Sequence, residues 1–287
     1  MTIAVTGANG SIGGQVLAAL IAAGADARPI TRADAAYDNT ARLAGALRGA
    51  ETVFLVSARE SADRMAEHTS AIDAVVASGA TRIVYLSFLG AAPDCTFTFG
   101  RDHFHTERLI RDSGLEFSFL RDNFYQKIVP HFASAEGVIR GPAEEGSLSA
   151  VADRDVVDVA AAVLLDPAAH SGATYQLTGP ESLTMAEYAA ALSRVSGRDI
   201  RFIDETVEEA YASRAVWNAP SFEVDGWVST YTAIAKGEVA VVSDDVHAVT
   251  GHEAQGFEEF LRECPDSWAH LAPNVGRRLS TDDPPPK

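Results

Sequence analysis

Short apolar runs alternate with amphipathic stretches along the first half of the chain. Five of these runs, each bounded by turn-forming residues, predict buried parallel strands at residues 3–5, 27–31, 52–56, 83–86 and 117–120. Between them, residues 62–77 place apolar side chains on one helical face, and Gly79 is suited to end that helix. This alternation predicts an α/β fold with a doubly wound parallel (Rossmann) sheet, whose ligand crevice lies at the carboxyl ends of the strands.

The second half of the chain follows a different pattern. Brief strands are predicted at 138–139, 147–151 and 174–177, and helices at 155–165, 184–195 and 221–236. We therefore expect residues 1–130 to form the Rossmann domain, with 152–178 returning to it. The remaining pieces, 131–151 and 179–266, are expected to form a smaller, mostly helical capping region. Residues 267–287 read as a disordered tail.

Three glycines, each three residues apart, separate the first predicted strand from the first helix. Such a turn removes Cβ atoms that would block a phosphate, and the new helix directs unpaired N–H groups and its positive dipole end at the anion. The alternative is a glycine-rich turn without a ligand, but the position directly after a strand favours dinucleotide binding. The predicted cofactor contacts in this turn are Thr6, Gly7, Asn9, Gly10, Ser11, Ile12 and Gly13.

Composition narrows the function further. The 287 residues are 47% hydrophobic and carry a formal net charge of −17, which disfavours binding to nucleic acid in the absence of a basic patch. No apolar run has the length of a membrane span, and the chain starts directly with a strand rather than a signal peptide. We expect a cytoplasmic protein without membrane contact. Cys95 and Cys264 lie far apart without metal-ligand spacing, so no metal site or disulfide is predicted.

The end of the second strand bears on the choice of cofactor. In this fold an acidic residue at that position binds the adenosine ribose, whereas an arginine pairs with a 2′-phosphate. Arg32 occupies it here, which favours NADP(H), although the nearby Asp34 leaves NAD(H) open. Residues 1–130 are thus predicted to be an NADP-binding domain. Val56, Ser57 and Ser87 follow or end apolar strands and are expected beside the cofactor.

Several motifs together resemble one family. The opening Thr-Gly-Ala-Asn-Gly-Ser-Ile-Gly-Gly, Thr31-Arg32 and segments 86–89, 103–107, 120–125, 235–238 and 243–245 are similar to the NmrA-like atypical short-chain dehydrogenases. Within that group, type-2 NAD(P)H:quinone oxidoreductases and triphenylmethane reductases are most similar. The resemblance runs from residue 1 to about 262 and implies a reductase.

Two departures from related proteins matter. Family members carry a longer segment with a third strand where this chain has only residues 33–42. Ordinary short-chain dehydrogenases carry Tyr-x-x-x-Lys where this chain has His103-x-x-x-Glu107, a pattern similar to the quinone reductase subgroup. His103 is the candidate catalytic residue, either as an acid near neutral pH or as a hydrogen-bonding group, and Glu107 one turn later is a candidate to orient it.

The missing tyrosine shapes the predicted chemistry. Reduction of a carbonyl to an alcohol needs a proton donor, whereas a quinone or extended dye takes hydride into a delocalised system, so positioning can supply most of the catalysis. Aromatic side chains suit such a flat, small aromatic or conjugated substrate. The predicted substrate pocket consists of Phe88, Phe99, Phe124 and Tyr125.

The sequence therefore predicts an NADPH-dependent oxidoreductase that transfers hydride to a quinone or a similar conjugated, dye-like acceptor. A second interpretation is a redox sensor, because NmrA-like regulators bind the dinucleotide without turning it over. A sugar-nucleotide epimerase or ordinary carbonyl reductase fits less well without the tyrosine. A homodimer is compatible with the sequence but is not specified by it.

Overall fold

The computed structural model describes residues 1–271, which divide into two compact units. The first unit comprises Met1–Asn123, Asp153–Thr178 and Ser243–Glu253, and the remaining described residues form the second. The first boundary between the units was expected after residue 130, whereas in the structure it follows Asn123, seven residues earlier. The chain also returns to the first unit a second time, at Ser243–Glu253, a segment that the sequence assigned to the capping region.

A six-stranded parallel sheet organises the first unit, and it confirms the predicted doubly wound fold. In spatial order the strands are β2 (Asp26–Ile30), β1 (Thr2–Thr6), β3 (Thr52–Leu55), β4 (Arg82–Phe88), β5 (Glu116–Asp122) and β8 (Thr174–Leu177). Strand β2 forms an edge, and no strand lies between it and Thr40. The shortened segment noted in the sequence thus leaves the sheet without the family's additional edge strand.

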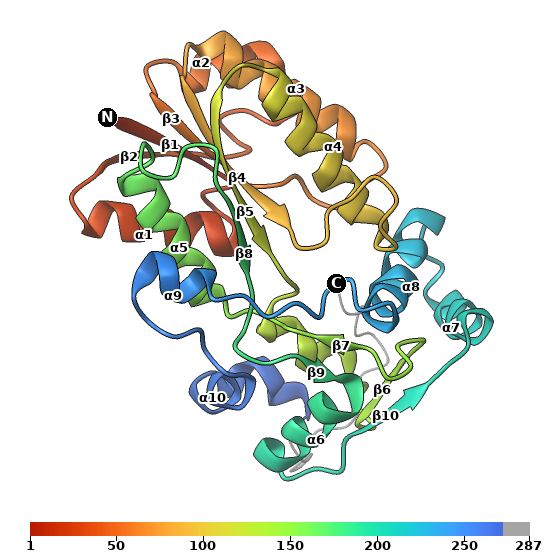
Figure 1. Ribbon diagram of the computed structural model, residues 1–287. Helices are drawn as coiled ribbons and strands as arrows, with labels where there is room; N and C mark the ends of the chain where they lie inside the picture. Colours follow the sequence, from red (N-terminus) through yellow and green to blue (C-terminus); the bar gives the residue numbers. More distant parts are fainter. Residues whose placement is uncertain (272–287) are drawn as a thin grey trace. The chain divides into compact units, whose positions relative to one another are not determined.

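Helices cover both faces of this sheet (Figure 1). One face carries α2 (Thr40–Leu47), α3 (Arg64–Ser78) and α4 (Thr98–Asp112), and the other carries α1 (Ser11–Ala22), α5 (Asp153–Leu165) and α9 (Asp245–Thr250). The four inner strands are mostly buried on both sides, as expected for a sheet covered on both faces, whereas the edge strands β2 and β8 are more exposed. On the α2–α4 face, Leu43, Ile72 and Ile110 pack with strand residues such as Val53 and Phe119 in one core cluster.

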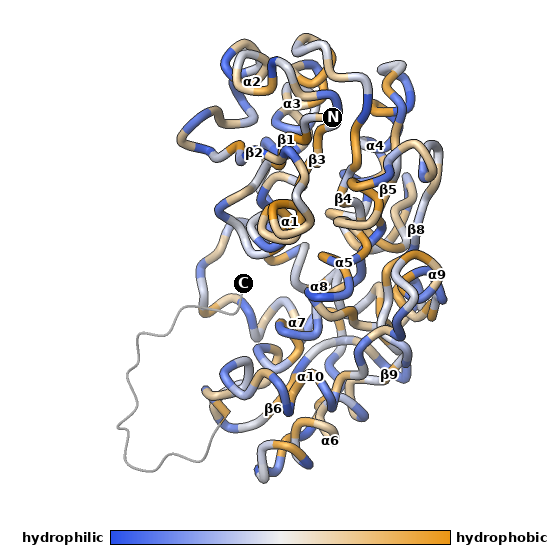
Figure 2. The backbone as a smooth tube through the Cα atoms, turned by 90° about the vertical axis from the view of Figure 1, so that its left-hand side faces the viewer, coloured by the Kyte–Doolittle hydropathy of each residue, from blue (hydrophilic) through white to orange (hydrophobic). Residues whose placement is uncertain are grey.

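The second unit is mostly helical among the described residues. Its short strands pair as β6 (Val138–Gly141) with β10 (Arg201–Asp204), in parallel, and as β7 (Ser147–Leu148) with β9 (Leu183–Thr184), antiparallel. Its helices are α6 (Met185–Ser196), α7 (Val207–Arg214), α8 (Ser221–Ala235) and α10 (Phe257–Glu263), with 3-10 turns η1 (Gln126–Phe132), η2 (Ala215–Trp217) and η3 (Pro265–Leu271). Hydrophobic and hydrophilic stretches alternate along α6, as expected for an amphipathic helix (Figure 2).

The structure corrects two local predictions in this unit, each in part. The strand predicted over 147–151 ends at Leu148, because Ser149 turns its hydroxyl toward the carbonyls of Val239 and Val241 and the Ala150 amide bonds Tyr188 Oη. Residues 267–271 of the predicted tail form the last part of η3, while 272–287 lie outside the described residues. Among the residues that the structure describes, no helix combines the length and apolar character needed to cross a membrane.

Candidate functional site

The glycine turn after β1 leaves the start of α1 open to a ligand. Gly10 is the N-cap residue and provides no side-chain cap, so the helix's first N–H groups are not covered by a capping side chain. Gly7 has a φ of +62°, and a Cβ on it would lie 3.1 Å from Val56 Cβ. A Cβ on Gly13 would lie only 2.4 Å from the Gly7 carbonyl oxygen. The turn therefore has the backbone shape of a diphosphate cradle, and the residues fit a dinucleotide.

Other residues predicted in this turn take different positions. Asn9 and Ser11 are exposed, whereas Ile12 is buried in the core. The Ser11 hydroxyl donates to Asp153 Oδ2 at 3.1 Å, which places a carboxylate at the start of α5 beside the start of α1. The predicted turn thus contains exposed polar residues together with one packing residue.

Thr6 uses its side chain to join two strands. Its hydroxyl donates to the Phe54 carbonyl at 3.0 Å and accepts from the Val56 amide at 3.0 Å. It also accepts from Tyr37 Oη at 2.6 Å, and Tyr37 Oη lies 2.7 Å from the Val56 carbonyl. Tyr37 was not among the predicted site residues, although it lies within the short segment 33–42, which contains no strand. Burial raises the Tyr37 pKa, so the phenol stays protonated and can donate.

Arg32 follows the end of β2 and is exposed to solvent. Its neighbour Asp34 is held locally, because Asp34 Oδ2 accepts from both the amide and the hydroxyl of Thr31, at 2.9 and 2.7 Å. These two hydrogen bonds from Thr31 lower the pKa of Asp34. One carboxylate oxygen is therefore already occupied at the place where an NAD-binding protein would offer an acid to the ribose, while Arg32 projects from the chain.

The two strand-end serines differ in their surroundings. Ser57 is half-buried, and its hydroxyl donates to the Leu86 carbonyl at 2.7 Å. Ser87 is fully buried, and its hydroxyl donates to Glu107 Oε1 at 2.7 Å. Arg121 pairs with the same carboxylate through two hydrogen bonds of 2.8 and 2.7 Å. Glu107 thus pairs with Ser87 and Arg121 instead of orienting His103, and the Ser87 hydroxyl is directed into the protein.

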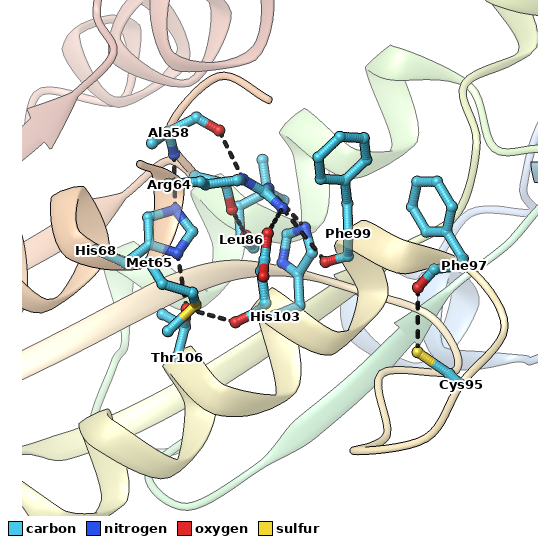
Figure 3. Close-up of polar contacts among 12 residues, drawn as sticks. Ala58, Arg64, Met65, His68, Leu86, Cys95, Phe97, Phe99, His103 and Thr106 are labelled. Carbon is cyan, nitrogen blue, oxygen red and sulfur yellow. Dashed lines mark hydrogen bonds and ion pairs between the residues drawn. The ribbon is translucent and has the colours of Figure 1, made fainter. Parts of the chain in front are cut away.

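His103, the candidate catalytic residue, is only 7% exposed on α4. Its Nε2 lies 2.9 Å from Arg64 Nη2 (Figure 3). Its Nδ1 lies 3.0 Å from Tyr85 Oη. Burial, then the charge of Arg64, holds the His103 pKa well below 6.5. A neutral imidazole with both nitrogens engaged suits a positioning role better than the predicted role of proton donor at neutral pH.

Aromatic side chains gather around the first turn of α4. The ring centroids of Phe88 and Phe97 are 4.9 Å apart, and those of Phe97 and Phe99 are 5.8 Å apart. Phe88 also lies 5.9 Å from the His103 ring. The structure therefore brings the predicted pocket residues Phe88 and Phe99 into one aromatic cluster next to His103. The other two predicted pocket residues, Phe124 and Tyr125, belong to the second unit.

No group of three or more His, Cys, Asp or Glu side chains able to hold a metal ion occurs within residues 1–271.

A family model described as the NmrA-like family matches residues 33–261. The chain belongs to the NmrA-like family. This confirms the resemblance inferred from the motifs. The match covers strands β3 to β8 of the sheet and most of the mostly helical unit, whereas β1, the glycine turn and β2 precede it.

Several named relatives of this NmrA-like chain are reductases. It is 31% identical to the NAD(P)H azoreductase of Xenophilus azovorans over 77% of each chain. It is 28% identical to quinone oxidoreductase 2 of Escherichia coli over 90% of this chain and 96% of that protein. A solved structure of the NADPH-dependent quinone oxidoreductase of E. coli in complex with NADPH superposes with a TM-score of 0.81 at 25% identity, covering 91% of this chain and 99% of that one.

Proposed function

We propose that this chain is an NADPH-dependent oxidoreductase that transfers hydride to a quinone or to a similar conjugated, dye-like acceptor. Its place among NAD(P)H-dependent reductases follows from the family and its named relatives, and the sequence prediction of a reductase is confirmed at that level. The proposal concerns the identity of the hydride acceptor.

One observation carries the choice of acceptor. The two positions that replace the usual tyrosine and lysine, His103 and Glu107, are both buried and both engaged by protein partners. Neither is free to protonate a developing alkoxide, so reduction of an isolated carbonyl is disfavoured. A conjugated acceptor spreads the incoming charge over its own ring system and takes its proton from water, so the protein needs only to position it.

The residues of the first unit account for cofactor binding in this proposal. The first turn of α1, opened by Gly10, would hold the diphosphate, and the exposed Arg32 would pair with a 2′-phosphate. When bound, the reduced nicotinamide would supply the hydride. Val56 and Ser57 would form the wall beside it, while Phe88 and Phe99 offer apolar ring surface to a flat substrate.

The deciding experiment follows NADPH absorbance with a panel of acceptors. We expect oxidation with benzoquinones, naphthoquinones, an azo dye or a triphenylmethane dye, and none above background with aliphatic aldehydes and ketones. Preferential reduction of the aliphatic carbonyls would overturn the proposal. Tight NADPH binding without turnover of any acceptor would favour the redox-sensor interpretation, which the same absence of a Tyr-x-x-x-Lys pair also suits.

The remaining aspects of this proposal concern the protein's surroundings. We propose a small aromatic or conjugated substrate as its partner, with no nucleic acid, and a cytoplasmic location. Light scattering coupled to size exclusion tests whether a homodimer forms, and cell fractionation tests the location.

A further inference from the structure

Helix α3 directs two buried side chains onto one peptide unit. Arg64 Nε donates to the Ala58 carbonyl at 3.1 Å, and the Ala58 amide donates to His68 Nε2 at 2.9 Å (Figure 3). Arg64 and His68 are four residues apart, so both lie on the same face of the helix. Both backbone polar groups of Ala58 are therefore held by side chains of α3.

The other end of the Arg64 guanidinium reaches α4. Nη1 lies 3.3 Å from the Phe99 carbonyl and 3.5 Å from Asp102 Oδ2, and Nη2 lies 2.9 Å from His103 Nε2. Arg64 is only 4% exposed. A buried guanidinium is tolerated only when its donors are matched to acceptors, and here one cation links the segment after β3 to the start of α4.

These contacts fix the protonation of both histidines. A guanidinium can only donate, so His103 Nε2 accepts and the neutral ring carries its proton on Nδ1, facing Tyr85 Oη. His68 Nε2 accepts from the Ala58 amide, so its Nδ1 donates to Thr106 Oγ1 at 2.7 Å. Burial, followed by the charge of Arg64, lowers the His68 pKa to about 3, which keeps this acceptor available at neutral pH.

The clamped segment adjoins the glycine turn. Residues 56–61 contain no regular secondary structure, yet the Val56 side chain lies within 3.1 to 3.4 Å of the point where Gly7 would carry a Cβ. Movement of Ala58 would shift Val56 and Ser57 directly, because they are adjacent in the chain. It would therefore alter the wall that faces the cradle.

We propose that Arg64 is a positioning residue for the cofactor, acting with His68 as a clamp on the Ala58 peptide. The clamp fixes residues 56–58 before the cofactor arrives and ties them to the α4 turn that carries Phe99 and His103. Arg64 itself touches neither cofactor nor substrate in this proposal. The inference rests on the proposed function, because it takes NADPH as the cofactor that residues 56–58 face. Its readouts are cofactor affinity and backbone protection, and neither needs turnover.

The first test replaces Arg64 with Met and with Lys and measures NADPH affinity by calorimetry. Loss of several hydrogen bonds from a charged donor predicts affinity weakened by about 10- to 100-fold in Arg64→Met, with partial recovery in Arg64→Lys. Amide hydrogen exchange at residues 56–63 of the cofactor-free protein should rise in the same order. A folded Arg64→Met protein with wild-type affinity and wild-type exchange overturns the proposal.

Arg214→Met is the matched control. Arg214 is also buried, in the second unit, where its guanidinium lies 3.3 Å from Glu205 Oε2. We expect this variant to lower the thermal midpoint without changing NADPH affinity or exchange at 56–63. Equal losses of affinity in both arginine variants would mean that general destabilisation explains the effect, and the clamp would be rejected.

His68 supplies an independent arm should Arg64→Met fail to fold. Glutamine places an acceptor close to the position of Nε2, so His68→Gln should keep NADPH affinity within about threefold of wild type, whereas His68→Leu should approach the loss expected for Arg64→Met. Identical behaviour of the two variants overturns the clamp.

The two proposals fail in distinguishable ways. A wild-type protein that binds NADPH but reduces no acceptor contradicts the proposed function, while the affinity and exchange comparisons still test the clamp. A wild-type protein that does not bind NADPH contradicts both the proposed function and the cofactor-positioning role of Arg64. Exchange at residues 56–63 then tests only whether Arg64 and His68 order this segment.

Discussion

The segments that follow β1 and β3 lie on neighbouring strands of one sheet but are built in opposite ways. After β1, the turn is held by backbone, with the Gly10 amide donating to the Gly7 carbonyl at 2.8 Å and no side chain capping α1. After β3, order comes from buried side chains, because Arg64 and His68 hold both polar groups of Ala58. Glycines shape the first segment, and an arginine and a histidine shape the second.

This difference follows from what each segment is expected to do. An anion site made of backbone N–H groups must stay free of capping side chains, so its shape has to come from glycine geometry. The segment after β3 is expected to line the cofactor site without donating hydrogen bonds to the anion. Side chains of helix α3 can therefore hold it in place. The glycine turn after β1 and the segment after β3 therefore owe their rigidity to different residues. Substitutions can remove the rigidity of one segment without changing the other.

The largest expected effect is on the glycine-built half. In Gly13→Ala the new methyl group would meet the Gly7 carbonyl oxygen at 2.4 Å and the Thr6 carbonyl oxygen at 2.8 Å, and backbone atoms cannot move aside as a flexible side chain can. We expect NADPH affinity to fall by about 100-fold or more and the protein to lose about 1–3 kcal/mol of stability. Calorimetry and thermal unfolding measure the two effects.

Gly45→Ala provides the control for that substitution. Gly45 lies in α2, and a Cβ there would meet nothing within 4 Å, so alanine should raise stability by roughly 0.5–1 kcal/mol and leave NADPH affinity unchanged. Wild-type affinity in Gly13→Ala would remove the cradle from the cofactor site.

A smaller effect should separate the diphosphate from the 2′-phosphate. Arg32→Ser removes an exposed guanidinium suited to a 2′-phosphate, so NADPH affinity should fall by about 10- to 30-fold while NADH affinity stays within about twofold. Paired titrations with the two cofactors check this. Arg108→Ser, another exposed arginine, on α4, serves as the control, and parallel losses for NADPH and NADH in Arg32→Ser would argue against a 2′-phosphate contact.

The segment after β3 is held by His68, so the stability of the protein should depend on pH through this histidine. The folded-state pKa of His68 is about 3, below its unfolded value of about 6.5. Above pH 6.5, His68 is neutral in both the folded and the unfolded state. Below pH 6.5, the histidine becomes protonated in the unfolded chain but stays neutral in the folded chain. Stability therefore falls as the pH falls, down to about pH 3. Between pH 6.5 and 5.5 this histidine should cost the wild type about 1 kcal/mol.

Denaturant unfolding at both pH values measures this change. Glutamine does not titrate, so His68→Gln should lose about 1 kcal/mol less than wild type over the same interval. Identical pH slopes in the two proteins would mean that folding does not change the pKa of His68. The subtraction is needed because other groups also titrate in this range, His103 among them.

Sequence reasoning succeeded where structure follows from local pattern. The inner sheet strands are short, largely apolar runs between turn signals, and the glycine turn is recognisable from its spacing and its position after a strand. The loss of the third strand was visible as a short segment. Exact strand ends were less predictable: 147–151 looks like a strand, but tertiary hydrogen bonds of Ser149 and Ala150 end it at Leu148.

The clamp was not predictable from the sequence, because it depends on contacts between distant segments. Arg64 and His68 at helical spacing resemble ordinary polar positions, and nothing local shows that they face inward onto Ala58. Tyr37 was missed for the same reason. The pairing of Glu107 with Ser87 and Arg121 instead of His103 also depends on the register of β4 and β5, which pairs Ser87 with Arg121.

The smallest expected effect concerns the charge next to the glycine turn after β1. Asp153 Oδ2 accepts from the Ser11 hydroxyl, so a carboxylate lies one hydrogen bond from a residue of the proposed diphosphate cradle. Asp153→Asn keeps an acceptor for Ser11 but removes a negative charge near the polyanionic cofactor, which should tighten NADPH binding by about two- to threefold at low salt.

Asp158→Asn, on the same helix but paired with His252 at 3.2 Å, is the control. The gain should shrink as salt is raised, because salt screens the repulsion between the carboxylate and the cofactor. A gain of equal size in Asp158→Asn would indicate a general effect of net charge, and weaker binding in Asp153→Asn would mean that the Asp153 carboxylate positions Ser11 more than it repels the ligand.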